Sequence, residues 1–266
     1  MIPAGDENLR VGRPVVNHLL IGLNVIVFIV SITRPQMLVP GATGLEDVIN
    51  ALGVKPFFIV RGEMLWTIIT AMFLHAGFAH ILGNMLYLYI FGDNIEAVMG
   101  KLRYLLFYLL SGLGAVVFHI ASISLIPPDR LLNYAFQGIN PWLVPAVGAS
   151  GAISGVLGAY MILYPGSLIR AVGFWFWIPM VFRVPASVYI VFWFAYQLFM
   201  GIFTLTGIPT GVAFWAHIGG FLTGIALVPL LVDRERITGL RMLAATRIGG
   251  FGEPYYAARV DNVEER

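Results

Sequence analysis

Five long stretches of the 266-residue chain contain no Asp, Glu, Lys or Arg. A helix of about 20 apolar residues spans the hydrocarbon core of a bilayer, where a charged side chain is costly. The stretches cover residues 14–33, 64–92, 104–128, 131–169 and 184–232. Only 11% of the residues are charged, against about a quarter in a typical soluble domain. The sequence therefore predicts an integral membrane protein.

Two of these stretches need to be divided before spans are assigned. Within 184–232, the segment 206–211 (TGIPTG) has the glycine and proline content of a turn. The first part of 131–169 is rich in Asn, Gln and Pro, so we interpret it as a loop that precedes a span. Six helices result, at residues 15–33, 80–98, 104–126, 148–164, 186–205 and 212–232.

The predicted fold class is an all-α integral membrane protein with a bundle of six transmembrane helices. The bundle is expected to occupy residues 14–232, between an N-terminal arm (1–13) and a C-terminal tail (233–266). An even number of spans puts both termini on one side of the membrane. That side carries twelve of the sixteen Lys and Arg residues, so the termini, the arm and the tail are predicted to be cytoplasmic.

Several classes of chemistry find no support in the composition. The chain has no cysteine, which excludes disulfides and thiol catalysis. The net charge of +2 is too small and too dispersed to indicate a nucleic-acid partner. We expect no cofactor and no metal. The sequence leaves the oligomeric state open.

A glycine stripe marks the start of the fourth predicted helix. Gly148, Gly151, Gly155 and Gly158 are spaced three or four residues apart, so they share one helix face and let another helix backbone approach closely. Ser150 lies beside this stripe. Close helix packing alone would explain the glycines, so the stripe by itself does not establish chemistry at the serine.

Three polar side chains are predicted at a similar depth. The second, fourth and sixth helices run in the same direction across the membrane, and His80, Ser150 and His217 all lie near their outer ends. Asn84 is one turn below His80 on the same helix face. On the sixth helix, His217 shares a face with Gly220 and Gly224. The two glycine faces should bring Ser150 and His217 together.

A buried hydroxyl and a buried imidazole are expected to bond each other, because an unpaired polar group costs about 1–3 kcal/mol. Serine bonded to neutral histidine is the activated nucleophile of acyl-transfer enzymes. His80 and Asn84 add side-chain donors, and the N-terminus of the fourth helix adds backbone N–H groups. Together these groups can form an oxyanion hole.

These residues resemble the signatures of the rhomboid family of intramembrane serine proteases. Residues 148–151 (GASG) are similar to the family's Gly-x-Ser-Gly motif, residues 75–84 (HAGFAHILGN) to its His-x4-His-x3-Asn motif, and residues 216–220 (AHIGG) to its last motif. The resemblance covers about residues 64–228, with Gly92 and Glu96 continuing the second motif.

The resemblance implies a role for each site residue. Ser150 would be the nucleophile and His217 the general base. His80, Asn84 and the Ser150 N–H would bind the oxyanion. His75 would support the adjacent loop, and the fifth helix with the external loops would admit substrates laterally. Gly148, Gly151, Ser154 and Gly220 are the predicted supporting residues.

The chain departs from the family pattern at two places. The tryptophan–arginine pair of the first external loop is absent, since Arg61 and Trp66 are not adjacent. Where some relatives have a tyrosine stacked on the catalytic histidine, this chain has Ser154. No Asp or Glu lies in mid-span, so we expect a dyad without an acidic third member, with Ser154 contributing to the orientation of His217.

The predicted function is an intramembrane serine endopeptidase of the cell membrane. It would cleave single-pass transmembrane proteins at or just inside the outer face of the bilayer. Alternatives are a catalytically inactive rhomboid-like protein that binds membrane clients, and a membrane hydrolase with zinc held by His75, His80 and His217. The second lacks a carboxylate base among its ligands. A transporter or channel would usually have an ionisable residue in mid-span.

Overall fold

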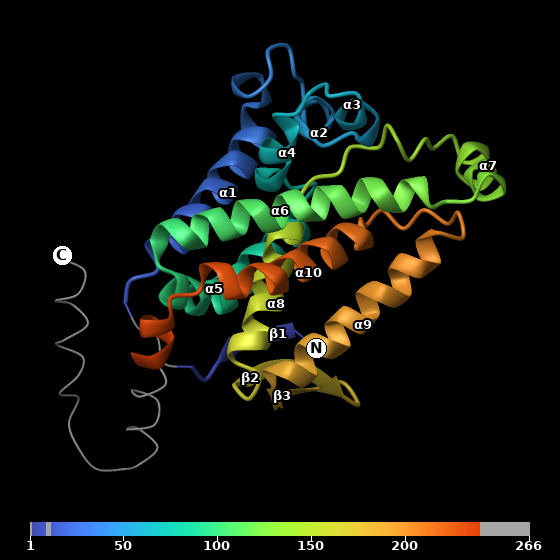
Figure 1. Ribbon diagram of the computed structural model, residues 1–266. Coiled ribbons are helices and arrows are strands. Elements are labelled where there is room, and N and C mark those ends of the chain that lie inside the picture. The colour runs from blue at the N-terminus through green and yellow to red at the C-terminus, as the bar shows by residue number, and fades with distance from the viewer. Residues whose placement is uncertain (1, 9–11, 240–266) are drawn as a thin grey trace, which may run out of the picture.

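Long helices form the body of the protein (Figure 1). The computed structural model describes residues 2–8 and 12–239; the rest of the predicted tail, 240–266, lies outside the described residues. The helices agree with the expected spans, and the largest difference is three residues, at the start of α6 (104 expected, 101 observed). They are α1 (Val15–Thr33), α5 (Phe78–Met99), α6 (Lys101–Ser124), α8 (Ser150–Leu163), α9 (Ala186–Thr204) and α10 (Phe214–Leu231).

Four of these helices, α1, α6, α9 and α10, are long and apolar enough to cross a membrane. A fifth span results if Thr67–Phe73 and α5, which meet at an angle of 92°, are counted as one broken span. α8 has 14 residues, a length of about 21 Å at 1.5 Å per residue, which is shorter than the hydrocarbon core of about 30 Å. The protein is an all-α membrane bundle in its apolar part. The count of six full spans stays a prediction.

Short helical segments connect α1 to α5 on one side of the bundle (Figure 1). They lie at residues 34–79, between the first and second predicted helices. Their bounds are η1 (Pro35–Met37), α2 (Leu45–Leu52), α3 (Pro56–Val60), α4 (Thr67–Thr70) and η2 (Ala71–Phe73). A further helix, α7 (Pro128–Phe136), lies in the connection between α6 and α8.

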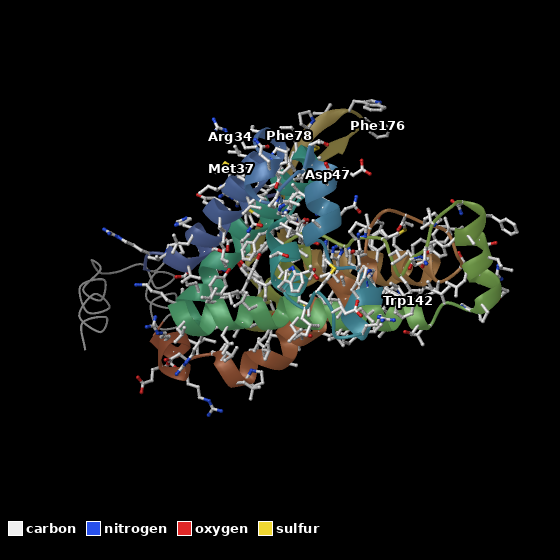
Figure 2. All side chains as sticks on the ribbon, turned by 90° about the horizontal axis from the view of Figure 1, so that it is seen from above. Arg34, Met37, Asp47, Phe78, Trp142 and Phe176 are labelled. Carbon is white, nitrogen blue, oxygen red and sulfur yellow. The ribbon has the colours of Figure 1, made fainter. Side chains whose placement is uncertain are left out.

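A three-stranded antiparallel sheet closes the opposite side and was not expected from the sequence. β1 (Ile2–Asp6) pairs with β2 (Leu168–Trp175), which pairs with β3 (Ile178–Pro185). β2 and β3 form a hairpin whose two turn residues, Phe176 and Trp177, both have positive φ. Figure 2 shows Phe176 at the hairpin tip, away from the helices. The predicted arm and the connection at 165–186 therefore combine in one sheet.

The first strand is tied to the ends of two helices. Asp6 accepts a hydrogen bond of 2.6 Å from the hydroxyl of Tyr160 on α8 and one of 2.9 Å from the side chain of Asn94 on α5. Tyr160 is fully buried. Because hydrogen bonds to a carboxylate are stronger than neutral ones, Asp6 fixes the end of α8 that is remote from Ser150.

The buried carboxylate of Glu96, near the end of α5, caps α1. It accepts hydrogen bonds from the backbone N–H groups of Val16 at 3.0 Å and Asn17 at 2.7 Å. The first N–H groups of a helix have no partner within it and carry the positive end of its dipole. A carboxylate placed there satisfies them and orients α1 against α5.

The glycine faces of α8 and α10 meet directly, which confirms the packing predicted from their spacing. A Cβ atom added to Gly220 would overlap the carbonyl oxygen of Gly151, and one added to Gly224 would overlap that of Gly155. A Cβ on Gly158 would lie 2.5 Å from the carbonyl oxygen of Phe221. The two backbones are therefore in contact along more than one turn.

Large apolar side chains cover the outward faces of the helices. Contiguous exposed apolar surface of this kind marks a membrane-facing region in a protein of this composition. Leu102 and Phe192, for example, are 80% and 74% exposed. Others are Leu19, Ile26, Leu82, Val117, Phe199, Ile202 and Leu230.

We predict that Gly155→Leu lowers the free energy of unfolding by about 3 kcal/mol, the upper end of overpacking costs. An added side chain meets Ser111 and the backbone of Gly220. Thermal unfolding in detergent micelles measures the effect. Gly83→Leu is the matched control, because Gly83 is also helical but has nothing within 4 Å of an added Cβ. Equal unfolding midpoints for the two variants would contradict the contact.

Candidate active site

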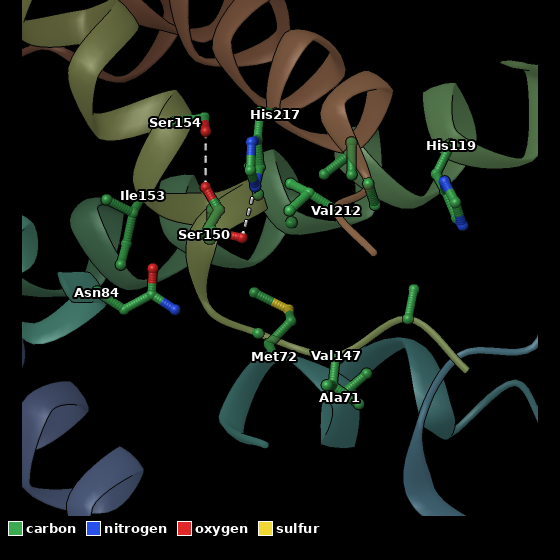
Figure 3. A pocket seen from close by; sticks show the side chains of 18 of the residues that line it. Ala71, Met72, Asn84, His119, Val147, Ser150, Ile153, Ser154, Val212 and His217 are labelled. Atoms are coloured by element: carbon green, nitrogen blue, oxygen red, sulfur yellow. Dashed lines mark hydrogen bonds between the residues drawn. The ribbon is translucent and has the colours of Figure 1, made fainter. Parts of the chain in front are cut away.

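A cavity of about 600 Å³ lies at the N-terminal end of α8. Side chains from α5, α6, α8, α9 and α10 line it, together with the loop that leads into α8. Figure 3 shows Ser150, His217 and Asn84 around this space. The predicted residues Ser150, His217, His80 and Asn84 all belong to its lining. The structure thus brings together side chains that are up to 137 positions apart (217 − 80).

Ser150 and His217 are hydrogen-bonded. The Ser150 Oγ lies 2.8 Å from the Nε2 of His217 (Figure 3). Ser150 is the first residue of α8, and His217 lies in the first turn of α10. The contact between Gly151 and Gly220 aligns α8 and α10 so that the two side chains face each other. Ser150 adjoins Gly151, and His217 lies one turn before Gly220. This is the arrangement of a nucleophile with its base.

The other ring nitrogen of His217 is bonded to a residue that the sequence analysis did not single out. The Nδ1 of His217 lies 2.9 Å from the Oε1 of Gln197 on α9. Gln197 is 4% exposed. A signal was available, because Gln197 is an amide in the middle of a predicted apolar span, and such groups need a partner. No rule of spacing, however, connects position 197 with position 217 on a different helix.

Ser154 makes no hydrogen bond to His217 in the part of the chain that the structure describes. Its hydroxyl donates a hydrogen bond of 2.7 Å to the backbone carbonyl of Ser150, one turn earlier (Figure 3). Serine in a helix commonly bonds the carbonyl four residues back. The Ser154 hydroxyl therefore bonds within the first turn of α8. The side chain that bonds the second nitrogen of the His217 ring is Gln197.

His80 lies beside the loop that carries the serine. Its Nδ1 is 3.4 Å from the backbone N–H of Ala76, a long hydrogen bond in which the ring nitrogen accepts. The proton of the neutral ring then resides on Nε2. That nitrogen would lie 2.8 Å from a Cβ at Gly148, and the Ser150 Oγ would lie 3.5 Å from the same Cβ.

Gly148 makes this close approach possible for two reasons. It has no side chain to collide with His80, and its φ of +127° is a conformation that other residues rarely adopt. The loop can therefore bring its backbone against the His80 ring immediately before α8 begins.

Asn84 is held by His75. The Asn84 Nδ2 lies 2.8 Å from the Nε2 of His75, and His75 is 1% exposed. The rings of His75 and His80 pack edge to face, with centroids 4.9 Å apart. An amide group has two hydrogens on its nitrogen. With one directed at His75, the other remains for a group in the cavity.

The three histidines of the zinc alternative do not converge as a set of metal ligands in the described part of the chain. Within residues 2–8 and 12–239, no group of three His, Cys, Asp or Glu side chains converges so that it could hold a metal ion. Both nitrogens of His217 are engaged, by Ser150 and Gln197.

A family model for the rhomboid domain matches residues 62–234. This is more than half of the chain, and the chain therefore belongs to the rhomboid family, whose members are of the intramembrane protease type. The match contains all the helices that line the cavity.

Individual relatives agree with this assignment. RHOMBOID-like protein 6, mitochondrial, of Arabidopsis thaliana is 32% identical over 195 residues, which are 71% of this chain and 50% of that protein. RHOMBOID-like protein 4 of the same plant is 32% identical over 202 residues, 76% of this chain and 42% of the relative. Rhomboid protease GluP of Bacillus subtilis (strain 168) is 31% identical over 150 residues, 56% of this chain and 25% of the relative. The chain spans half or less of the length of these curated relatives.

Proposed function

We propose that the protein is an intramembrane serine endopeptidase that uses a Ser150–His217 dyad. The observation that carries the proposal is the 2.8 Å hydrogen bond between the Ser150 Oγ and the His217 Nε2 at a cavity in a membrane bundle. A buried serine–histidine pair next to a helix N-terminus suits acyl transfer. Membership of the rhomboid family supports the same reaction.

The reaction follows from the positions of the two side chains. The Ser150 Oγ attacks the carbonyl carbon of the scissile peptide bond, and its proton passes to the His217 Nε2. The resulting tetrahedral intermediate expels the amine, which takes this proton from Nε2 as the C–N bond breaks. Water then attacks the acyl-serine ester, giving its proton to Nε2, and Ser150 leaves with that proton restored.

In this proposal, three donors stabilise the oxyanion of the intermediate. The backbone N–H of Ser150 is at the start of α8, where N–H groups have no partner within the helix. The Nε2–H of His80 lies next to the serine loop, and the Asn84 side chain lines the same cavity as Ser150 (Figure 3). Positive charge at the helix N-terminus adds to their effect. His75 supports this set by holding Asn84.

The substrates in this proposal are single-pass transmembrane proteins. Ser150 lies at the start of a short helix, so a segment that reaches it must bend into the bundle near one face of the membrane. The strands of the sheet lie at the opposite end of α8 (Figure 1). With the Lys and Arg distribution, we assign the sheet, the arm 1–13 and the tail 233–266 to the cytoplasm, and the cavity to the outer face. Residues 14–232 form the protease domain.

Ser150→Ala and His217→Ala should each abolish cleavage, because the two side chains act as a unit, and the double variant should be no worse than either single one. Cleavage of a transmembrane substrate in vesicles and labelling by a fluorophosphonate probe measure this. Ser124→Ala, at the exposed end of α6, is the matched serine control and should behave as wild type. Persistent cleavage by Ser150→Ala would overturn the dyad.

Loss of one oxyanion donor should be less severe. Removing a single donor typically lowers kcat by about 10²–10³-fold. We expect Asn84→Ala to lower kcat by about 10²-fold or less, because His80 and the Ser150 N–H remain as donors. His80→Ala combined with Asn84→Ala should approach the activity of Ser150→Ala. Asn133→Ala, on α7 and outside the cavity lining, is the control for loss of an amide. An unchanged kcat in the His80→Ala/Asn84→Ala variant would remove both residues from the oxyanion hole.

A further inference from the structure

We infer that Gln197 is a positioning residue of the site: its side-chain carbonyl holds His217 in the tautomer that leaves Nε2 free to accept the serine proton. The inference rests on the proposed dyad and assigns a role to a residue on α9, which supplies neither the nucleophile nor the base. Its basis is the 2.9 Å contact between the Gln197 Oε1 and the His217 Nδ1.

The bond to Ser150 cannot by itself select the tautomer. A serine hydroxyl both donates and accepts, so it can bond Nε2 whether or not that nitrogen carries the proton. Only the unprotonated Nε2 can take the proton of Ser150. A second partner is therefore needed to define the state of the ring.

A carbonyl oxygen provides this definition, because it only accepts hydrogen bonds. When the Gln197 Oε1 faces Nδ1, the neutral ring gains a hydrogen bond only if Nδ1 carries its proton. Nε2 is then left with a lone pair, which points at the Ser150 Oγ 2.8 Å away. The two contacts of His217 thus agree with one tautomer, the one that a base requires.

The other neighbours of the ring do not duplicate this function. The rings of Trp193 and Phe214 lie 6.3 Å from the His217 ring, centroid to centroid. Among the described residues, the side-chain hydrogen bonds of His217 go to Gln197 and Ser150 and not to Trp193. Phenyl has neither donor nor acceptor, so these two rings restrict His217 sterically without selecting a tautomer. Ser154 directs its hydroxyl to the Ser150 carbonyl.

The burial of Gln197 also fits this role. An amide that is 4% exposed in an apolar span is costly unless it is bonded, and its contact with His217 compensates part of that cost. A carboxylate in its place would bring a charge into the span at a much higher desolvation cost. Glutamine is thus a neutral acceptor long enough to reach the ring from α9.

The tautomer is measured directly by ¹⁵N NMR of histidine-labelled protein. The spectra are recorded in the Ser150→Ala background, so the result does not depend on hydrolysis, and the His217 signals are identified by their loss in His217→Ala. With Gln197 present, we expect the proton on Nδ1. Gln197→Met keeps a similar length without a strong acceptor, and the signals should shift toward a mixture of tautomers.

In the Ser150-containing enzyme, Gln197→Met should lower kcat by about threefold to tenfold, the effect of one neutral hydrogen bond on the barrier. KM should stay within about twofold, because the bond acts on the base and not on substrate binding. Trp215→Phe is the control for helix contact, since it removes the 2.8 Å bond from the Trp215 Nε1 to the Gly201 carbonyl, which also joins α10 to α9.

Two outcomes separate this inference from the proposed function. An unchanged His217 tautomer and an unchanged kcat in Gln197→Met, in an enzyme that Ser150→Ala inactivates, would overturn the role of Gln197 and leave the dyad intact. A tautomer shift in Gln197→Met, in a protein whose cleavage survives Ser150→Ala, would support the contact and overturn the dyad. An equal tautomer shift in Trp215→Phe would reduce the effect to helix packing and also overturn the inference.

Discussion

The backbone contact between α8 and α10 is the constraint on which the site depends. Gly220 faces the carbonyl of Gly151, and Gly224 faces that of Gly155, so the relative level of the two helices is fixed at two successive positions. Ser150 and His217 are each within one turn of the first contact. A slip of one turn would displace them by about 5.4 Å and break a hydrogen bond of 2.8 Å. The geometry of the Ser150–His217 pair is therefore a consequence of glycine packing. Such packing matters in a bilayer, because lipid supplies little hydrophobic driving force for association between helices.

Buried polar groups elsewhere in the bundle show what distinguishes the site. The side chain of Asn17 donates to the Leu88 carbonyl and accepts from the Tyr104 hydroxyl, and Glu96 caps α1. These groups are bonded to protein and hold helices together. At the cavity, His80 and Asn84 are also hydrogen-bonded to protein groups. Each of these two side chains nevertheless keeps an N–H hydrogen that is free to bind a group in the cavity. The same requirement for hydrogen bonding thus produces structural links in one place and leaves donors beside a cavity in another, as the proposed oxyanion hole requires.

Much of this arrangement could be predicted from the sequence, because charge-free runs and glycine spacing are local signals. They predicted the helix bounds, the packing of α8 on α10 and the gathering of Ser150, His217, His80 and Asn84. The hairpin β2–β3 was not predicted, because the residues at its two turn positions with positive φ are Phe176 and Trp177. Glycine or asparagine usually marks such a turn in a sequence. The contact between Gln197 and His217 was not predicted, because it depends on how α9 is rotated and tilted against α10. No spacing within one helix encodes that relation.

The role inferred for Gln197 explains how a base can be oriented without an acid. A carboxylate beside a catalytic histidine both fixes the tautomer and stabilises the imidazolium that forms. Only the first task needs an acceptor, and a neutral carbonyl performs it without placing a charge in the span. The lack of Asp and Glu in the apolar runs is therefore compatible with an ordered base. The weaker stabilisation of imidazolium by a neutral oxygen leaves more of the barrier to the oxyanion donors, which is consistent with a site that combines a helix N-terminus with both His80 and Asn84.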